Sequence, residues 1–497
     1  MAERVTTGVQ GLDEVLHGGY VKNRSYLVRG EPGVGKTLLG LHFLVDGVEN
    51  GESSLFINLG APEADIRSDA AEIGLDLTGV EILDLSPASD FFVDNQMYDI
   101  FTAAEVERGE FTEVISDAVR KLQPTRVFVD PLTQFRYLSP DEYQFREEVL
   151  SFLQFLKEEG CTTLFTSQST RTFPDDDLQF VSDGNIHLYY GEVLHHIEVT
   201  KMRGTEFEHG PQTLEIGDGG MRVFSLLRPG RFQVDFEPEL LPSTNETLDA
   251  LLNGGIERGT TTLISGPTGV GKTTVAMQFM ISAAQRGERA VIYLFEESEN
   301  TFVLRAESIG FPIKRLAEEE KLSVMQVEAY EHSAEQFSGQ VRREVESNGT
   351  KYVMIDGIDG YVASINGGEE ELISRLHALV GYLRNVGVTT FLTTEMETIT
   401  GQFRPTSRRA SYLADNILFL GYFELSAKLH RSIGVLKKRA GDFDHDIHEF
   451  YISQDGIRVG RKLSKLHGIL TGTPRWVEDI PEMDDMFADD SGMAGDD

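Results

Sequence analysis

The sequence predicts an α/β protein built from two tandem copies of one domain, each a mostly parallel, twisted sheet flanked by helices. The main observation is that the motif G-x-x-x-x-G-K-[ST] occurs twice, at residues 30–37 and 266–273. Each copy lies between a strand-like apolar run and a helical pattern, which is the context of a phosphate-binding P-loop. These flanking runs and helical patterns are 25–28 and 38–45 in the first copy, and 262–264 and 275–280 in the second.

The second observation is a repeat that extends well beyond the loops. An offset of 236 residues that superimposes the P-loops also aligns Leu12 with Leu248 and His209 with His445. Agreement at both ends of so long a unit indicates duplication of a whole domain, and 497 residues are enough for two such domains. We therefore predict a first domain at 1–235, a second at 236–475 and an acidic tail at 476–497.

The P-loops predict nucleotide binding in both halves. Their glycines allow backbone N–H groups to surround phosphate oxygens, the lysine brings charge to the β- and γ-phosphates, and the threonine can ligate Mg²⁺. The chain lacks an Asn-Lys-x-Asp guanine motif after the loops, so the predicted cofactors are ATP and Mg²⁺. The residues assigned to this role are Gly30, Gly33, Gly35, Lys36, Thr37, Gly266, Gly269, Gly271, Lys272, Thr273 and Thr274.

An acidic residue ends a second strand in each half. Residues 126–130 and 352–356 each consist of four apolar or bulky residues followed by an aspartate, which is typical of a buried parallel strand with a carboxylate at its C-terminal edge. Such an aspartate holds Mg²⁺ in P-loop enzymes, directly or through water. The predicted metal ligands are Thr37, Asp130, Thr273 and Asp356.

The two halves differ at the residues expected to activate a nucleophile. In the second half, Glu296 and Glu297 follow a predicted strand, where paired carboxylates suit general-base chemistry near a γ-phosphate; a solvated turn is the alternative. The repeat offset places Gly60 and Ala61 at these positions in the first half, with Glu63 farther along. Lys36, Lys272, Glu296 and Glu297 are the predicted catalytic residues, and we expect slow hydrolysis in the first domain.

Two further features recur in both halves. A third strand ends in polar residues, at 162–168 and 389–395, which either sense the γ-phosphate or form a polar strand end. Each half then closes on a Lys-x-Arg pair, and two cations one residue apart on a strand point to the same face. Such a pair either guards a sheet edge or reaches a neighbouring chain's phosphate. The pairs are Lys201 with Arg203 and Lys437 with Arg439.

Composition narrows the function classes. The net charge of −36 makes nucleic acid a poor partner, and 31 arginines against 14 lysines in so acidic a chain favour adaptation to high salt. Cys161 is the only cysteine, so an intrachain disulfide is excluded. No apolar run approaches 18 residues and the N-terminus lacks a signal-peptide pattern, so we expect a cytoplasmic protein without membrane contact. The acidic tail is predicted to be disordered.

Together these motifs resemble the KaiC family, the double-domain RecA-like ATPases of the circadian clock and their archaeal and bacterial relatives, here of a haloarchaeal type. The resemblance covers about residues 5–475 and rests on both P-loops, residues 295–298, both Lys-x-Arg pairs and the tandem arrangement. It implies two RecA-like P-loop NTPase domains and a homohexamer with ATP between subunits. Lys201, Arg203, Lys437 and Arg439 would then contact the neighbour's nucleotide, with His209 and His445 nearby.

The resemblance also implies serine/threonine autophosphorylation in the second domain. Ser411 matches the acceptor serine, Thr406 matches a third nearby threonine, and Tyr412 departs from the family's threonine. The acidic tail and the missing first-domain glutamates are further departures. The chain is thus interpreted as a KaiC-like regulatory ATPase, not necessarily of a clock, with a protein partner that the sequence does not name.

Two other functions stay open at this stage. A RecA-like recombination or repair ATPase would use basic loops, and Arg404, Arg408 and Arg409 form the notable basic cluster. A nucleotide-switched scaffold would bind ATP with little turnover in either domain.

Overall fold

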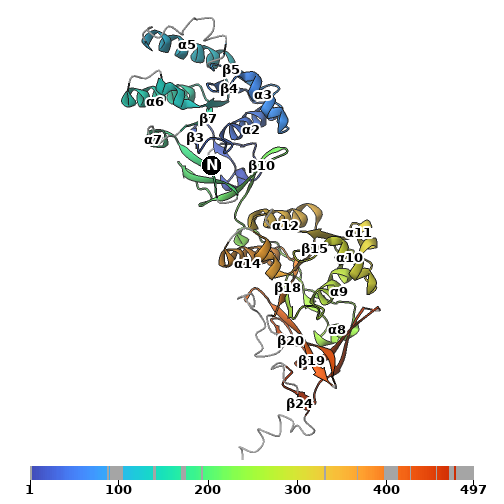
Figure 1. Ribbon diagram of the computed structural model, residues 1–497. Coiled ribbons are helices and arrows are strands. Elements are labelled where there is room, and N and C mark those ends of the chain that lie inside the picture. The colour runs from blue at the N-terminus through green and yellow to red at the C-terminus, as the bar shows by residue number, and fades with distance from the viewer. Residues whose placement is uncertain are drawn as a thin grey trace, which may run out of the picture. The chain divides into compact units, whose positions relative to one another are not determined.

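The computed structural model describes most of the chain as two units. Contacts divide the chain between Leu226 and Leu227, and in Figure 1 each unit is a sheet with helices packed against it. The described residues are 3–86, 89, 104–137, 141–168, 175–191, 194–328, 332–365, 368–396, 412–425, 427–454, 456–469 and 475–476, without the side chains of 104–111.

Within these residues, the first unit forms a nine-stranded sheet in the order β11-β10-β9-β8-β3-β7-β6-β4-β5. Strands from β8 to β5 run parallel, and β9 to β11 extend one edge in antiparallel fashion. The strands of this sheet are β3 (Ser25–Arg29), β4 (Ser54–Asn58), β5 (Glu81–Asp84), β6 (Arg126–Asp130), β7 (Thr162–Thr166), β8 (Gly184–Tyr190), β9 (His195–Met202), β10 (Gln212–Gly217) and β11 (Gly220–Phe224). Two short strands, β1 (Arg4–Val5) and β2 (Tyr20–Val21), form a separate antiparallel pair. The helices are α1 (Leu12–Val15), α2 (Lys36–Glu49), α3 (Glu63–Glu72), α5 (Ala104–Leu122), the 3₁₀ helix η1 (Leu132–Tyr137), α6 (Glu142–Glu158) and α7 (Asp176–Val181).

The described part of the second unit repeats this plan in the order β16-β15-β17-β18-β14-β19-β20-β21-β22, with β16 to β19 parallel. Its strands are β12 (Leu240–Leu241), β13 (Ile256–Glu257), β14 (Thr261–Gly266), β15 (Ala290–Leu294), β16 (Leu322–Gln326), β17 (Tyr352–Asp356), β18 (Thr389–Glu395), β19 (Asn416–Leu425), β20 (Lys428–Lys438), β21 (His448–Ser453), β22 (Gly456–Lys462), β23 (Leu466–His467) and β24 (Arg475–Trp476). Its helices are η2 (Pro229–Arg231), α8 (Glu246–Leu251), α9 (Lys272–Gln285), α10 (Glu299–Ser308), α11 (Ile313–Glu318), α12 (Ala334–Asn348), α13 (Ile358–Ser364) and α14 (Glu369–Asn385).

Apolar strands buried on both faces explain the parallel sheets. Successive side chains of a strand point to opposite faces, so Tyr26 and Val28 enter one core of the first unit while Leu27 enters the other. In the second unit, Ile264 and Leu263 divide in the same way. Helices cover both faces of each sheet, and the predicted α/β fold is confirmed.

The internal repeat extends to the strand register. β4 and β15 are offset by the same 236 residues as the P-loops. Asn58 at the end of β4 pairs with Asp130, and Leu294 at the end of β15 pairs with Asp356. Equivalent strand ends therefore pair with equivalent aspartates, Asp130 and Asp356, in the two units.

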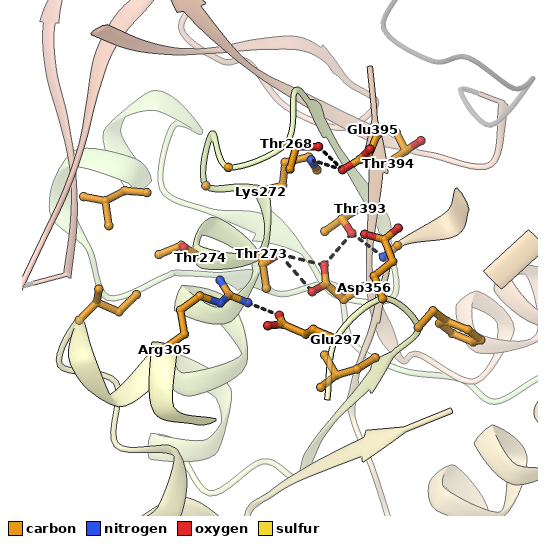
Figure 2. Close-up of a pocket in the computed structure, with 18 residues that line it drawn as sticks. Thr268, Lys272, Thr273, Thr274, Glu297, Arg305, Asp356, Thr393, Thr394 and Glu395 are labelled. Carbon is orange, nitrogen blue, oxygen red and sulfur yellow. Dashed lines mark hydrogen bonds and ion pairs between the residues drawn. The ribbon is translucent and has the colours of Figure 1, made fainter. Parts of the chain in front are cut away.

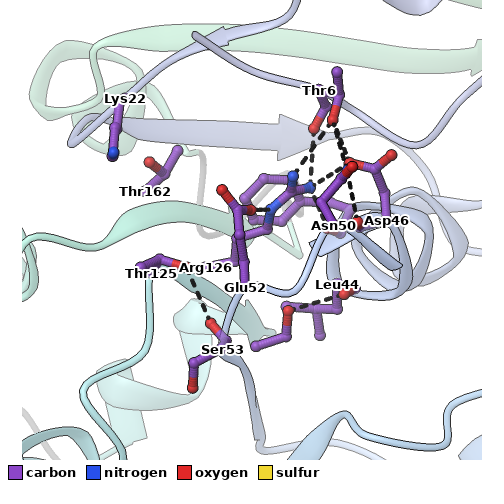
Figure 3. Close-up of polar contacts among 12 residues, drawn as sticks. Thr6, Lys22, Leu44, Asp46, Asn50, Glu52, Ser53, Thr125, Arg126 and Thr162 are labelled. Atoms are coloured by element: carbon purple, nitrogen blue, oxygen red, sulfur yellow. Dashed lines mark hydrogen bonds and ion pairs between the residues drawn. The ribbon is translucent and has the colours of Figure 1, made fainter. Parts of the chain in front are cut away.

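The first unit contains a buried cation that the second lacks at the matching strand position (Figure 3). Arg126, 1% exposed, begins β6; its Nη1 lies 2.7 Å from Asp46 Oδ2, and its Nε also pairs with Glu52. Nη1 donates to the carbonyl oxygens of Phe43 at 2.8 Å and Thr6 at 3.0 Å. This network ties the N-terminal segment to the P-loop helix α2 and to the central sheet.

Tyr352 begins the matching strand β17 of the second unit. Its hydroxyl accepts a hydrogen bond from Arg286 Nη2 at 2.7 Å, so a neutral phenol replaces the buried guanidinium. The same place in the duplicated fold is therefore stabilised by different chemistry in the two units.

Residues 227–234, which are predicted to lie at the end of the first domain, pack on the second unit. Leu227 and Phe232 lie against its core, and Asn385 Nδ2 donates to Pro229 O at 2.8 Å. Val234 N donates in turn to Asn385 O at 3.0 Å.

Across the described residues, no helix is both long and apolar enough to cross a bilayer.

Candidate active site

Both P-loops connect a central strand to the start of a long buried helix. Gly35 and Gly271 precede α2 and α9 with φ values of 94° and 113°, a region that favours glycine. A Cβ on Gly30 would lie 2.0 Å from Leu188 O, and one on Gly266 would lie 2.6 Å from Leu420 O. Backbone approach at the strand end therefore requires glycine in each loop.

The P-loop lysines fold back onto their own loops. Lys36 Nζ donates to the carbonyl oxygens of Gly30 and Glu31, both at 2.8 Å. Lys272 Nζ donates to Pro267 O at 3.2 Å. Burial lowers the pKa of both lysines, because the charged form loses water. Each ammonium is thus held at the mouth of its loop.

The aspartate at the end of each second strand is bridged to the P-loop threonine. Thr37 Oγ1 donates to Asp130 Oδ2 at 2.5 Å, and Thr273 Oγ1 lies 3.0 and 3.1 Å from the two oxygens of Asp356. Burial raises the pKa of both aspartates, and the donated hydrogen bonds oppose this shift.

A threonine of the third strand completes each of these clusters. Thr166 donates to Asp130, and Thr393 Oγ1 donates to Asp356 Oδ1 at 2.7 Å. Each cluster offers carboxylate and hydroxyl oxygens as metal ligands. Mg²⁺ prefers ligands of this type, so the residues present fit this ion. The sequence predicts polar ends for these two strands, but it does not indicate that their threonines bond to the aspartates.

In the second unit these groups surround a pocket of about 440 Å³ (Figure 2). Its walls come from the P-loop, the start of α9, the ends of β15, β17 and β18, and α10. The lining residues are Thr268, Gly269, Gly271, Lys272, Thr273, Thr274, Leu294, Phe295, Glu296, Glu297, Arg305, Ile309, Asp356, Gly357, Thr393, Thr394, Glu395 and Ile452.

The two adjacent glutamates occupy different environments within this pocket. Glu297 forms an ion pair with Arg305 of α10, which holds its carboxylate in place. Glu296 packs over the backbone of Gly357 and Gly360, since a Cβ on Gly357 would lie 2.5 Å from Glu296 Oε1. Burial raises the pKa of Glu296, and the nearby carboxylates Glu395 and Asp356 raise it further. No sequence motif indicates that Arg305 pairs with Glu297 or that Gly357 and Gly360 pack against Glu296.

The first unit lacks both carboxylates. The strand register leaves Gly60 and Ala61 at the matching positions, and Asn58 Nδ2 braces this turn by donating to Ala61 O at 2.6 Å. Glu63 begins α3 and pairs with Arg67 Nε at 2.7 Å, as an exposed helix-surface contact. The pair of pocket-facing acids is therefore specific to the second unit.

Comparison with known proteins assigns the chain to a family. The family model "ATPase: KaiC" matches residues 5–228 and again residues 241–464. The chain belongs to the KaiC ATPase family. It is 26% identical to the circadian clock oscillator protein KaiC of Acaryochloris marina over 99% of this chain and 96% of that protein. It is 27% identical to the circadian clock protein KaiC3 of a Synechocystis strain, over 95% of each.

A third relative, the circadian clock oscillator protein KaiC of Prochlorococcus marinus, is 28% identical over 96% of this chain and 94% of its own length. The tandem KaiC architecture predicted from the repeat is therefore confirmed along nearly the whole chain.

Each Lys-x-Arg pair runs from beside the middle of the central strand toward its N-terminal end, away from its own P-loop. Lys437 pairs with Ile417, which stands beside Leu263, the third residue of β14, whereas the P-loop begins at Gly266, the last residue of that strand. Three residues of strand span roughly 10 Å. Lys201 likewise pairs with Asn185 beside Leu27 of β3.

Each pair is anchored by its lysine and exposes its arginine. Lys201 Nζ donates to Gln179 O and Ser182 O at 2.7 Å, and Lys437 Nζ donates to Ala414 O at 2.6 Å. The side chains of Arg203 and Arg439 are 55% and 65% exposed. On the following loops, the rings of His209 and His445 lie tilted against those of Phe207 and Phe443.

The remaining candidates from the sequence lie outside the described residues. These are Ser411, Thr406, the cluster Arg404, Arg408 and Arg409, and the tail beyond Trp476. Tyr412, the first described residue after this segment, is half-exposed and meets the ring of His377 edge-on at 5.3 Å.

Proposed function

We propose that this KaiC-family protein is a regulatory, Mg²⁺-dependent ATPase whose turnover is concentrated in the second domain. The observation that carries the proposal is the position of Glu296 and Glu297 in the pocket formed by the P-loop and Asp356, against Gly60 and Ala61 in the first domain. The first domain then mainly binds nucleotide and supports assembly.

Within this proposal, the P-loop amides and Lys272 bind the phosphates, while Thr273 and Asp356 hold Mg²⁺, whose charge offsets that of the phosphates. Thr37 and Asp130 do the same in the first domain with Lys36. Glu296 is the general base, because it lines the pocket beside Lys272 and Asp356, and its raised pKa makes its carboxylate a stronger base. Glu297 is a positioning residue held by Arg305.

We also propose a serine/threonine autokinase activity at the second site, as the family resemblance implies. A serine hydroxyl would attack the γ-phosphorus, its proton would pass to Glu296, and ADP would leave as the bond to the β-phosphate oxygen breaks. Ser411 is the proposed acceptor. The relatives are named circadian clock proteins, and we extend to this chain only a regulatory role read by a protein partner.

The location of the Lys-x-Arg pairs supports assembly of the site between subunits. Cations that lie away from their own P-loop are badly placed for their own nucleotide, and the exposed Arg203 and Arg439 suit contact with a neighbour's phosphates. We propose a homohexamer in which Lys201, Arg203, Lys437 and Arg439 act on the adjacent chain. The charge of −36 disfavours a nucleic-acid partner.

The test compares three full-length variants with the parent protein, at high salt with Mg²⁺ and γ-labelled ATP. Glu296→Gln/Glu297→Gln should lose most phosphate release, whereas Lys36→Ala should retain second-domain turnover if assembly persists. Ser411→Ala should lose protein labelling and keep phosphate release.

Retained turnover in the double glutamine variant, with loss in Lys36→Ala, would reverse the proposed roles of the domains. ATP binding without turnover in any form would favour a nucleotide-switched scaffold. DNA-stimulated turnover that falls steeply with salt would favour the recombination class instead.

A further inference from the structure

A carboxylate of the second domain contacts its own P-loop. Glu395 is the last residue of β18, and Thr268 Oγ1 of the P-loop donates to its Oε1 at 2.5 Å (Figure 2). Lys272 Nζ lies 3.9 Å from the same oxygen. Glu395 N donates to Asp359 Oδ2 at 2.9 Å, which fixes the strand end. The side chain is therefore directed at the lysine that would meet the β- and γ-phosphates.

The first domain has a neutral residue at this position. Two residues after Thr166, which bonds Asp130 as Thr393 bonds Asp356, stands Gln168. Gln168 N donates to Thr133 Oγ1 at 3.2 Å, as Glu395 N donates to Asp359. Pro32 stands where the second P-loop has Thr268, so the hydroxyl that orients Glu395 is also replaced.

The second site has acidic residues at several positions where the first domain has neutral ones. Four of its acidic positions, Glu296, Glu297, Asp359 and Glu395, correspond to Gly60, Ala61, Thr133 and Gln168 in the first domain. The first two have the catalytic role proposed above. Glu395 is the one that lies on the P-loop lysine, where the nucleotide's terminal phosphates are also expected to bind.

We infer that Glu395 sets the nucleotide affinity of the second domain and weakens its binding of ATP more than of ADP. The inference rests on the proposed function. Without nucleotide, Glu395 partly neutralises Lys272; with nucleotide, the phosphates must take over the lysine and meet the Glu395 charge. ADP lacks the γ-phosphate, so it experiences less of this repulsion. The first domain, without the carboxylate, then holds ATP more firmly while the second exchanges it.

The size of the effect follows if a terminal phosphate bound by Lys272 comes as close to Glu395 as the lysine itself, which lies 3.9 Å away. A unit charge about 4 Å from another changes a binding constant about fivefold even at the dielectric constant of water, and more at a part-buried site. Glu395→Gln should therefore lower the Kd for Mg·ATP about fivefold or more and the Kd for Mg·ADP by a smaller factor. Glutamine is nearly isosteric and is the first domain's own residue here.

The experiment measures both Kd values by calorimetry on the full chain at high salt, with one P-loop silenced at a time. Glu395→Gln is read in a Lys36→Ala background, and the reciprocal Gln168→Glu in a Lys272→Ala background. We expect tighter ATP binding in the former and weaker ATP binding in the latter.

Unchanged Kd values after Glu395→Gln, or equal tightening of ATP and ADP, would overturn the inference. So would loss of turnover with unchanged affinity, since that would make Glu395 a catalytic residue. Failure of the Lys36→Ala protein to bind ATP before Glu395 is changed would instead refute the proposed function of the second domain. Thermal melts of each variant establish that the domain is folded.

Discussion

Replacement of Arg126 by methionine tests whether the buried charge network stabilises the first domain. Methionine retains a long, unbranched side chain in place of the arginine's aliphatic part. The change removes the guanidinium, which pairs with Asp46 and Glu52 and donates to two backbone carbonyl oxygens (Figure 3). Removing one partner of a buried ion pair costs about 3–5 kcal/mol, because the other charge is left uncompensated. The side chains of Asp46 and Glu52 are 20% and 31% exposed, so water can recover part of this cost.

We therefore expect a loss near the lower end, about 3 kcal/mol. In a domain of this size each kcal/mol lowers Tm by about 2–4 °C, so the first domain's transition should fall by about 6–12 °C in differential scanning calorimetry. Tyr352→Phe is the matched control in the second domain, since it removes one hydrogen bond worth about 1 kcal/mol.

The result that would refute this reasoning is an Arg126→Met transition lowered no more than that of Tyr352→Phe. The dependence of Tm on salt concentration gives a second test of whether the ion pair is buried. Because the Arg126 side chain is 2% exposed, mobile ions cannot reach it, and the difference between variant and parent should persist as salt is raised. A difference that vanishes at high salt would indicate a solvent-accessible pair.

Two further predictions concern the second site. Burial, together with Glu395 and Asp356, raises the pKa of Glu296; a base must be ionised, so turnover should fall as pH drops through this raised pKa, above the usual glutamate range. The pH profile of kcat would contradict this if its acid limb lay at or below pH 4. Arg439→Ala should cost at least tenfold in ATPase activity of the assembled protein while Tm stays within about 3 °C, because Asp415, the buried partner of Arg439, keeps its ion pair with Arg384 at 3.2 Å. Full activity in an assembly of unchanged size, measured by light scattering, would exclude its proposed role across subunits.

Much of the site could be predicted from sequence because its chemistry follows strand ends. The P-loops, Asp130, Asp356 and the glutamate pair all stand at the ends of runs that the sequence marks as strands. Parallel strands bring their C-terminal ends to one edge, so residues distant in sequence meet there without knowledge of the packing. The repeat offset likewise located Gly60 and Ala61, because duplicated strands keep their register.

Contacts that depend on how helices and the antiparallel edge pack were decided by the tertiary structure. Arg305 reaches Glu297 from α10, and Glu395 reaches Lys272 across two neighbouring strands, neither at a spacing that a motif records. The Lys-x-Arg pairs could not be placed from sequence, because only the pairing of β20 with β19 puts Lys437 away from its own P-loop. Short sequence motifs determine local backbone geometry. The partners of long, charged side chains depend instead on burial and charge in the folded sheet.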